Sequence, residues 1–195
     1  MVLPWAVAGI ALLSLIAYIA GRSFGGGSPS PAAAIAVADS PGRAPDISRM
    51  SPTERADRLF QRVMEYVRAG KSDSVRFFAP MAIQSQLALA PLDDHRRYDL
   101  GILAMVSGDA EMAKAQADTI LASQPDHLLG LILAMRTAGM RLDTASRSAF
   151  ATRLIEVADR ERAKGLPEYT DHDPDITAAI REAANPSAPV SRPTP

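Results

Sequence analysis

Apolar and polar residues follow a different pattern in each of four parts of the chain. The first part, Val2 to Ala20, has no charged side chain and almost no polar one. Glycine, proline, alanine and serine then dominate up to residue 50. From Ser51 onward, apolar residues recur every three or four positions, which is the spacing of amphipathic helices. Four prolines crowd the last ten residues. The pattern therefore divides the chain at residues 2–21, 22–50, 51–185 and 186–195.

The first apolar segment, residues 2–21, predicts a transmembrane helix. About 20 apolar residues in a helix span a bilayer core of roughly 30 Å. A cleaved signal peptide is the alternative, but no basic side chain precedes Val2 and the run is longer than the apolar part of most signal peptides. The expected localisation is a single-pass membrane protein of bacterial inner-membrane type, in contact with the lipid bilayer through this segment.

The side of the membrane on which the rest of the chain lies stays open. Arg22 directly follows the apolar segment, and the positive-inside rule then places the C-terminal part in the cytoplasm. A linker rich in proline, alanine and serine suits a periplasm equally well. Residues 22–50 cannot bury a core, so we expect a disordered tether, and we expect the same of the tail at 186–195.

Seven helices are predicted between residues 51 and 185. Ser51 followed by Pro52 is a typical helix start. Pro80 is expected to kink or divide the second helix, Gly139 to end the fifth, and residues 167–173 to form a loop. The predicted helices lie near residues 52–69, 74–89, 94–106, 110–123, 127–138, 144–165 and 174–185.

Composition narrows the classes of function. The chain has no cysteine, which excludes disulfides, thiolate metal sites and a cysteine nucleophile. Its formal net charge of −1 gives no electrostatic reason to expect nucleic acid as a partner. Aromatic residues make up only 5% of the chain, and alanine, leucine and methionine are plentiful, which favours an all-α fold over a β-sandwich.

A repeat is suggested by prolines at equivalent places. Pro91 and Pro125 lie 34 residues apart, each after a predicted helix and before an acidic cap. Thirty-four residues is the tetratricopeptide period, and the chain from Asp94 to Pro125 resembles one such repeat. Small residues in this pattern let paired helices approach closely. The matching positions are Leu100 and Gly101 in the first helix, Gly108 in the turn, Ala113 in the second helix, and Pro125 at the end.

The resemblance implies a fold and a function. The fold is a short stack of antiparallel helix pairs, a tetratricopeptide-like solenoid behind one transmembrane helix. The function is that of a non-catalytic scaffold or adaptor that binds another protein on the concave surface formed by the first helix of each pair. Arg97 and Arg136 are the polar residues expected to contact the partner, because guanidinium groups suit extended peptides and carboxylates. The alternative is an accessory structural subunit of a membrane complex, or an assembly chaperone such as those of cytochrome c maturation.

Few residues suggest chemistry, and the sequence predicts neither an enzyme, a cofactor nor a metal site. His95 and His127 each follow an acidic residue at a predicted helix start, and neither has metal-ligand spacing to another histidine, so both are interpreted as surface residues near helix caps. Asp171, His172 and Asp173, with Glu168 nearby, form the densest group of metal-capable side chains. We interpret this group as a loop and a helix cap, and it is the sole support for an enzyme as a third hypothesis.

Overall fold

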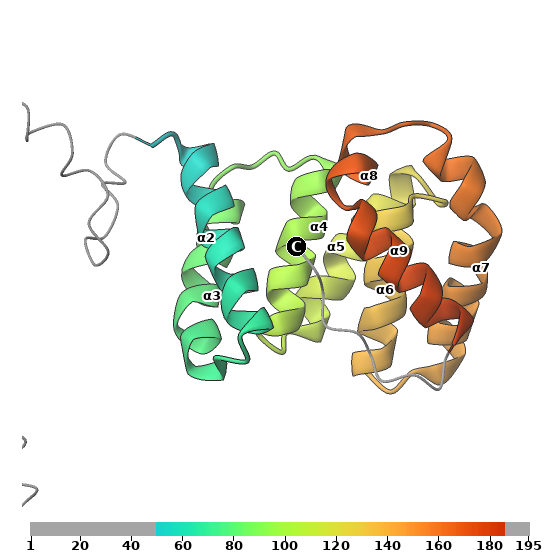
Figure 1. Cartoon of the computed structure of the whole chain (residues 1–195), viewed down its shortest axis with the longest axis horizontal. Coiled ribbons are helices and arrows are strands. Elements are labelled where there is room, and N and C mark those ends of the chain that lie inside the picture. The colour runs from blue at the N-terminus through green and yellow to red at the C-terminus, as the bar shows by residue number, and fades with distance from the viewer. Residues whose placement is uncertain (1–49, 186–195) are drawn as a thin grey trace, which may run out of the picture. The chain divides into compact units, whose positions relative to one another are not determined.

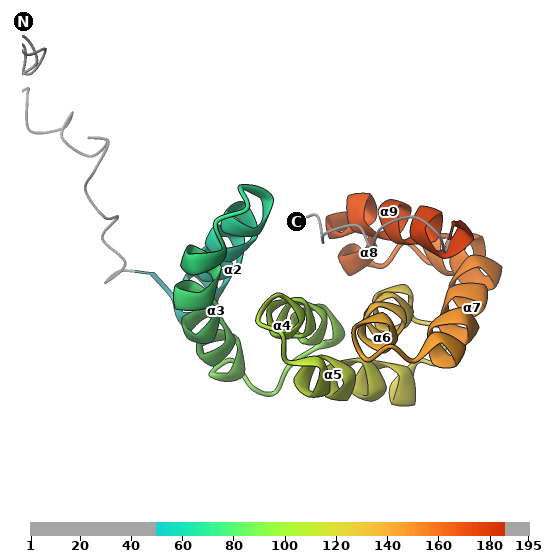
Figure 2. The same cartoon turned by 90° about the horizontal axis from the view of Figure 1, so that it is seen from below.

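The computed structural model describes residues 50–185, and its helices are shown in Figures 1 and 2. The predicted segment at 2–21, the tail at 186–195 and all but the last residue of the 22–50 linker lie outside the described residues. Within residues 50–185, none of the helices has both the length and the apolar character needed to cross a bilayer. The predicted localisation as a single-pass membrane protein therefore receives no support from the described residues.

The described residues form an all-α fold, as predicted. Eight helices were found between residues 50 and 185, one more than the sequence predicted. The additional helix, α8, occupies part of the segment expected to be a loop. The helices are α2 (Pro52–Arg68), α3 (Ser72–Leu87), α4 (Asp94–Val106), α5 (Ala110–Ser123), α6 (Leu128–Met140), α7 (Thr144–Arg162), α8 (Pro167–Asp171) and α9 (Asp173–Ala184).

Helix starts follow the predicted capping chemistry. Ser51 and Glu54 form a capping box, in which the Ser51 hydroxyl accepts from the Glu54 amide and the Glu54 carboxylate accepts from the Ser51 amide. Asp93, Asp109 and Asp143 each accept a hydrogen bond from a backbone amide three residues later, at the starts of α4, α5 and α7. These side chains satisfy amide groups that have no partner inside the helix.

Two residues predicted to interrupt helices do not break them. Pro80 lies inside α3 without dividing it. Gly139 does not end α6, which continues to Met140, and the left-handed residue after this helix is Leu142, with φ 59°. Gly108 does occupy the expected turn after α4, with φ 83°, a backbone conformation that glycine adopts without steric cost.

From α2 to α7, consecutive helices pack side by side, and α6 lies at the centre of the C-terminal part. It contacts α4, α5, α7 and α9. Figure 2 shows α4 and α6 in one row, with α5 and α7 outside them. Helix α9 lies on the side of α6 that faces away from α5. All residues of α6 from Leu128 to Ala138 are buried as a consequence.

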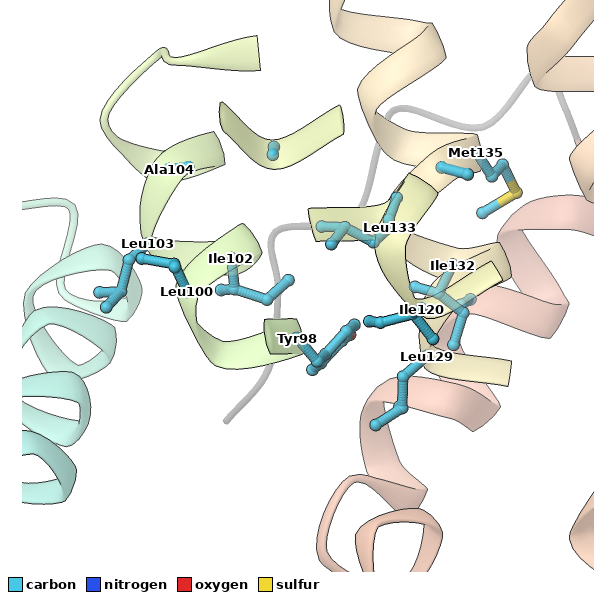
Figure 3. Close-up of a cluster of buried hydrophobic side chains, with 14 of the residues drawn as sticks. Tyr98, Leu100, Ile102, Leu103, Ala104, Ile120, Leu129, Ile132, Leu133 and Met135 are labelled. Atoms are coloured by element: carbon cyan, nitrogen blue, oxygen red, sulfur yellow. The ribbon is translucent and has the colours of Figure 1, made fainter. Parts of the chain in front are cut away.

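The core between α4, α5 and α6 is built mainly from aliphatic side chains, together with Tyr98 and Met135 (Figure 3). Gly101 of α4 lies directly against Leu133 of α6, and a Cβ atom added at Gly101 would come within 2.9 Å of Leu133 Cδ1 and 3.1 Å of Leu133 Cγ. From the sequence, Gly101 was expected to allow close approach within a helix pair. The close approach is instead between α4 and α6, which belong to successive pairs.

Candidate functional site

A buried ionic cluster joins α6 to α9. The Arg136 side chain is 0% exposed, in the middle of a helix that is otherwise almost entirely apolar. Its Nη2 lies 2.9 Å from Asp175 Oδ1, and its Nε donates to Glu182 Oε2 at 3.2 Å. Both carboxylates are buried and lie two turns apart on one face of α9. Arg136 therefore holds α9 against α6 through two ion pairs.

Tyr98 of α4 extends this cluster. Its hydroxyl donates to Asp175, and burial followed by the charge of Asp175 raises the pKa of Tyr98 well above its usual value. Burial alone lowers the pKa of Arg136, but Tyr98, Asp175 and Glu182 outweigh it and the net shift is upward. The arginine is therefore charged and the tyrosine neutral throughout the physiological pH range. Helices α4, α6 and α9 thus share one buried polar network.

The position of Arg136 does not fit its predicted role on a partner-binding surface. Its guanidinium is enclosed by α9 of the same chain, and it is not exposed to a second protein. Arg97 is half-buried, and its Nη1 donates to Gln116 of α5 at 3.3 Å. The two arginines therefore do not meet on one surface. The predicted partner-binding surface is the concave side formed by the first helix of each pair. At α6, this surface is covered by α9.

A second polar cluster lies beside Tyr98, where the junction of α8 and α9 meets α4. His95 and Asp99 are four residues apart on α4, and His95 Nε2 lies 3.7 Å from Asp99 Oδ2. The Nε2 atom of His172, from the α8–α9 junction, lies 3.6 Å from Asp99 Oδ1. The two imidazole rings contact each other edge to face, with centroids 4.8 Å apart. We call these three residues the His95–Asp99–His172 cluster.

Burial shifts the pKa values of this cluster. It raises the pKa of the Asp99 carboxyl to about 7, although Arg96 opposes the shift. It lowers the pKa of His172 to about 4, with a further contribution from His95. His172 is consequently a neutral imidazole at physiological pH. Asp99 Oδ1 and His172 Nε2 are both buried and have no hydrogen-bond partner among the described residues.

The sequence contained a partial signal for each cluster. A single arginine within the apolar stretch from Leu128 to Ala138 indicates a buried charge that needs a buried partner. His95 and Asp99 share one helix face because they are four residues apart. Along the sequence, His95 and His172 show no metal-ligand spacing to each other. The approach of His172 to α4 depends on how α8 and α9 pack, which has no local pattern.

The remaining predicted residues are in mixed positions. His127 was expected at the surface near a helix cap, but it is fully buried, with Nε2 3.4 Å from Glu168 Oε1 and its ring against Tyr169. Asp171 and Asp173 are exposed, as a loop or cap role implies. Of the residues expected to pack the repeat, Leu100, Gly101 and Ala113 are buried, Gly108 makes the turn, and Pro125 lies exposed between α5 and α6.

Exposed apolar side chains gather on α3. Phe77 is 68% exposed and Met81, one turn later, is 41% exposed. Beside the start of this helix, a hollow is lined by residues from the end of α2, the α2–α3 turn, the start of α3 and the end of α4, including Tyr66, Val75 and Val106. We call Phe77 and Met81 the α3 patch.

No family model matches the chain, and no curated protein or solved structure is significantly similar to it.

Proposed function

We propose that residues 51–185 form a tetratricopeptide-like, non-catalytic module that binds another protein as a scaffold or adaptor. The observation that carries this proposal is the contact of Gly101 with Leu133, which packs α4 against α6. In stacked helix pairs, the first helices of neighbouring pairs contact each other in this way, and the array presents an extended surface to a partner. The row formed by α4 and α6, with α5 and α7 outside it, agrees with such a stack (Figure 2).

The surface proposed for the partner is the α3 patch. The inner face near α6 is covered by α9, whereas Phe77 and Met81 are exposed on the first helix pair. Aromatic and methionine side chains are enriched in protein interfaces, and methionine adapts its shape to an apolar partner. The partner that fits this patch is a protein with an apolar helix face or an extended apolar segment.

A binding measurement tests the proposal. The full-length chain is used to isolate a partner, which is then purified, and its dissociation constant is measured by calorimetry. We expect Phe77→Ser to weaken binding by about fivefold or more, because truncating an interface anchor costs more than about 1 kcal/mol. Ile155→Ser is the matched control, because Ile155 is 45% exposed on α7, away from the α3 patch.

Two results would contradict this proposal. One is that no isolated protein binds the purified chain with a measurable dissociation constant. The other is that Phe77→Ser and Ile155→Ser bind the partner equally well, which would remove the α3 patch from the interface. Circular dichroism of both variants shows that any loss of binding is not a loss of fold.

A further inference from the structure

We propose that the His95–Asp99–His172 cluster binds a divalent transition-metal ion, and that Zn²⁺ is the cation it fits best. The cluster offers two imidazole nitrogens and one carboxylate oxygen. These are the donor types that Zn²⁺ binds in proteins, and three protein ligands with water as the fourth form a common tetrahedral arrangement. Mg²⁺ and Ca²⁺ prefer oxygen ligands alone, so a cluster with two nitrogens disfavours them.

The geometry of the cluster is close to that of a metal site. One ligand atom from each of the three residues lies within 4.8 Å of the others. Ligands of tetrahedral Zn²⁺ at about 2.0–2.1 Å from the metal lie about 3.3 Å from one another. Asp99 already has one histidine nitrogen at 3.6 Å and another at 3.7 Å, on its two oxygens. Small side-chain rotations therefore suffice to bring three ligands around one ion.

Two buried polar atoms of this cluster have no hydrogen-bond partner among the described residues. Asp99 and His172 are 4% and 6% exposed, yet Asp99 Oδ1 and His172 Nε2 face each other without a hydrogen bond. Buried polar atoms in folded proteins are almost always paired. The nearby Arg96 guanidinium is held by Asp57 of α2. A cation between Asp99 and His172 would satisfy both unpartnered atoms.

The surroundings also suit a metal ion. The other ring nitrogen of His95, Nδ1, lies 3.9 Å from Asp171 Oδ2. Histidines that bind a metal commonly direct their second nitrogen at a carboxylate, which orients the ring. The side chain of His95 is 33% exposed, so the cluster has one side open to solvent for entry of the ion and for a water ligand.

The expected consequence of binding is structural. His95 and Asp99 belong to α4, whereas His172 joins α8 to α9, so one ion would connect two segments that are far apart in the sequence. The ion would fasten the start of α9 to α4, next to the hydrogen bond between Tyr98 and Asp175. This inference is independent of the proposed function, because the cluster and the α3 patch use different residues.

Metal binding is tested with the purified full-length chain after treatment with EDTA. Co²⁺ is the first probe, because its visible absorption reports the number and geometry of nitrogen and oxygen ligands. Zn²⁺ is the second probe. We expect one Co²⁺ per chain with a tetrahedral or five-coordinate spectrum, displaced by one Zn²⁺. At a free Zn²⁺ concentration of about 100 times the dissociation constant, the melting temperature should rise by roughly 5–10 °C.

Variants assign the binding to the cluster. His95→Asn should weaken Zn²⁺ binding by at least about tenfold, and since His95 is partly exposed this variant should still fold. Asp99→Asn should do the same. Asp173→Asn is the matched control, because Asp173 lies next to His172 but pairs with Arg162 and is 60% exposed, so its affinity should match the wild type. Absence of Co²⁺ absorption in the wild type, or equal Zn²⁺ affinity of His95→Asn and Asp173→Asn, would overturn the proposal.

Discussion

Arg136→Met is expected to lower the free energy of unfolding by about 3–5 kcal/mol, a large part of the stability of a domain of this size. The substitution keeps the apolar stem of the side chain and removes its charge. Asp175 and Glu182 then remain buried at the interface of α6 and α9 without their main cation. Removing one partner of a buried ion pair costs more than the pair contributes, because the remaining charge stays desolvated.

The measurement is urea unfolding followed by far-UV circular dichroism, with Arg153→Met as the matched control. Arg153 also pairs with two carboxylates, Asp126 and Glu156, but its side chain is 48% exposed, so its loss should cost less than about 1 kcal/mol. Adding Asp175→Asn and Glu182→Gln to Arg136→Met should recover part of the stability. If it recovers none, lost packing rather than unpaired charge explains the effect. Equal destabilisation by Arg136→Met and Arg153→Met would contradict the buried ion pairs.

Gly101→Ala is expected to lower the free energy of unfolding by about 1–3 kcal/mol, although alanine is the better helix former. The added methyl group would meet both the Cδ atoms and the Cγ atom of Leu133. Leu133 is 0% exposed and enclosed by the core, so the side chain cannot move aside without disturbing its neighbours (Figure 3).

Two further variants make this test specific. At Gly139, also within a helix, an added Cβ would meet its nearest neighbour, Arg147 Cδ, at 3.4 Å. Gly139→Ala should therefore raise the stability by roughly 0.5–1 kcal/mol through the lower flexibility of the unfolded chain. In a Leu133→Ala background, Gly101→Ala should no longer destabilise the protein. The contact between α4 and α6 would be disproved if Gly101→Ala were as stabilising as Gly139→Ala.

Local chemistry made most of the helices predictable. Ser51, Asp93, Asp109 and Asp143 cap helices at or next to the expected positions, because each side chain satisfies amide groups only a few residues away. By contrast, Pro80 does not divide α3, and Gly139 lies within α6 rather than after it. Packing of α3 and α6 against their neighbours outweighs the intrinsic preference of one residue to interrupt a helix.

The role of Arg136 shows what a local pattern omits. Its position within an apolar helix indicates burial, but the sequence analysis placed it on a binding surface, since a repeat would present that face to a partner. The structure has α9 on this face, with Asp175 and Glu182 directed at the guanidinium. The two carboxylates that pair with Arg136 are thus 39 and 46 residues away in the same chain.

The helical character of residues 51–185 and the starts of most of its helices were predictable from the sequence. These properties depend on spacing and capping within a few residues. The folded arrangement was needed to find that Gly101 meets Leu133, that α9 covers Arg136, and that His172 lies beside His95 and Asp99. Such contacts link residues that are distant in the chain, and they follow from how whole helices pack, which no short segment encodes.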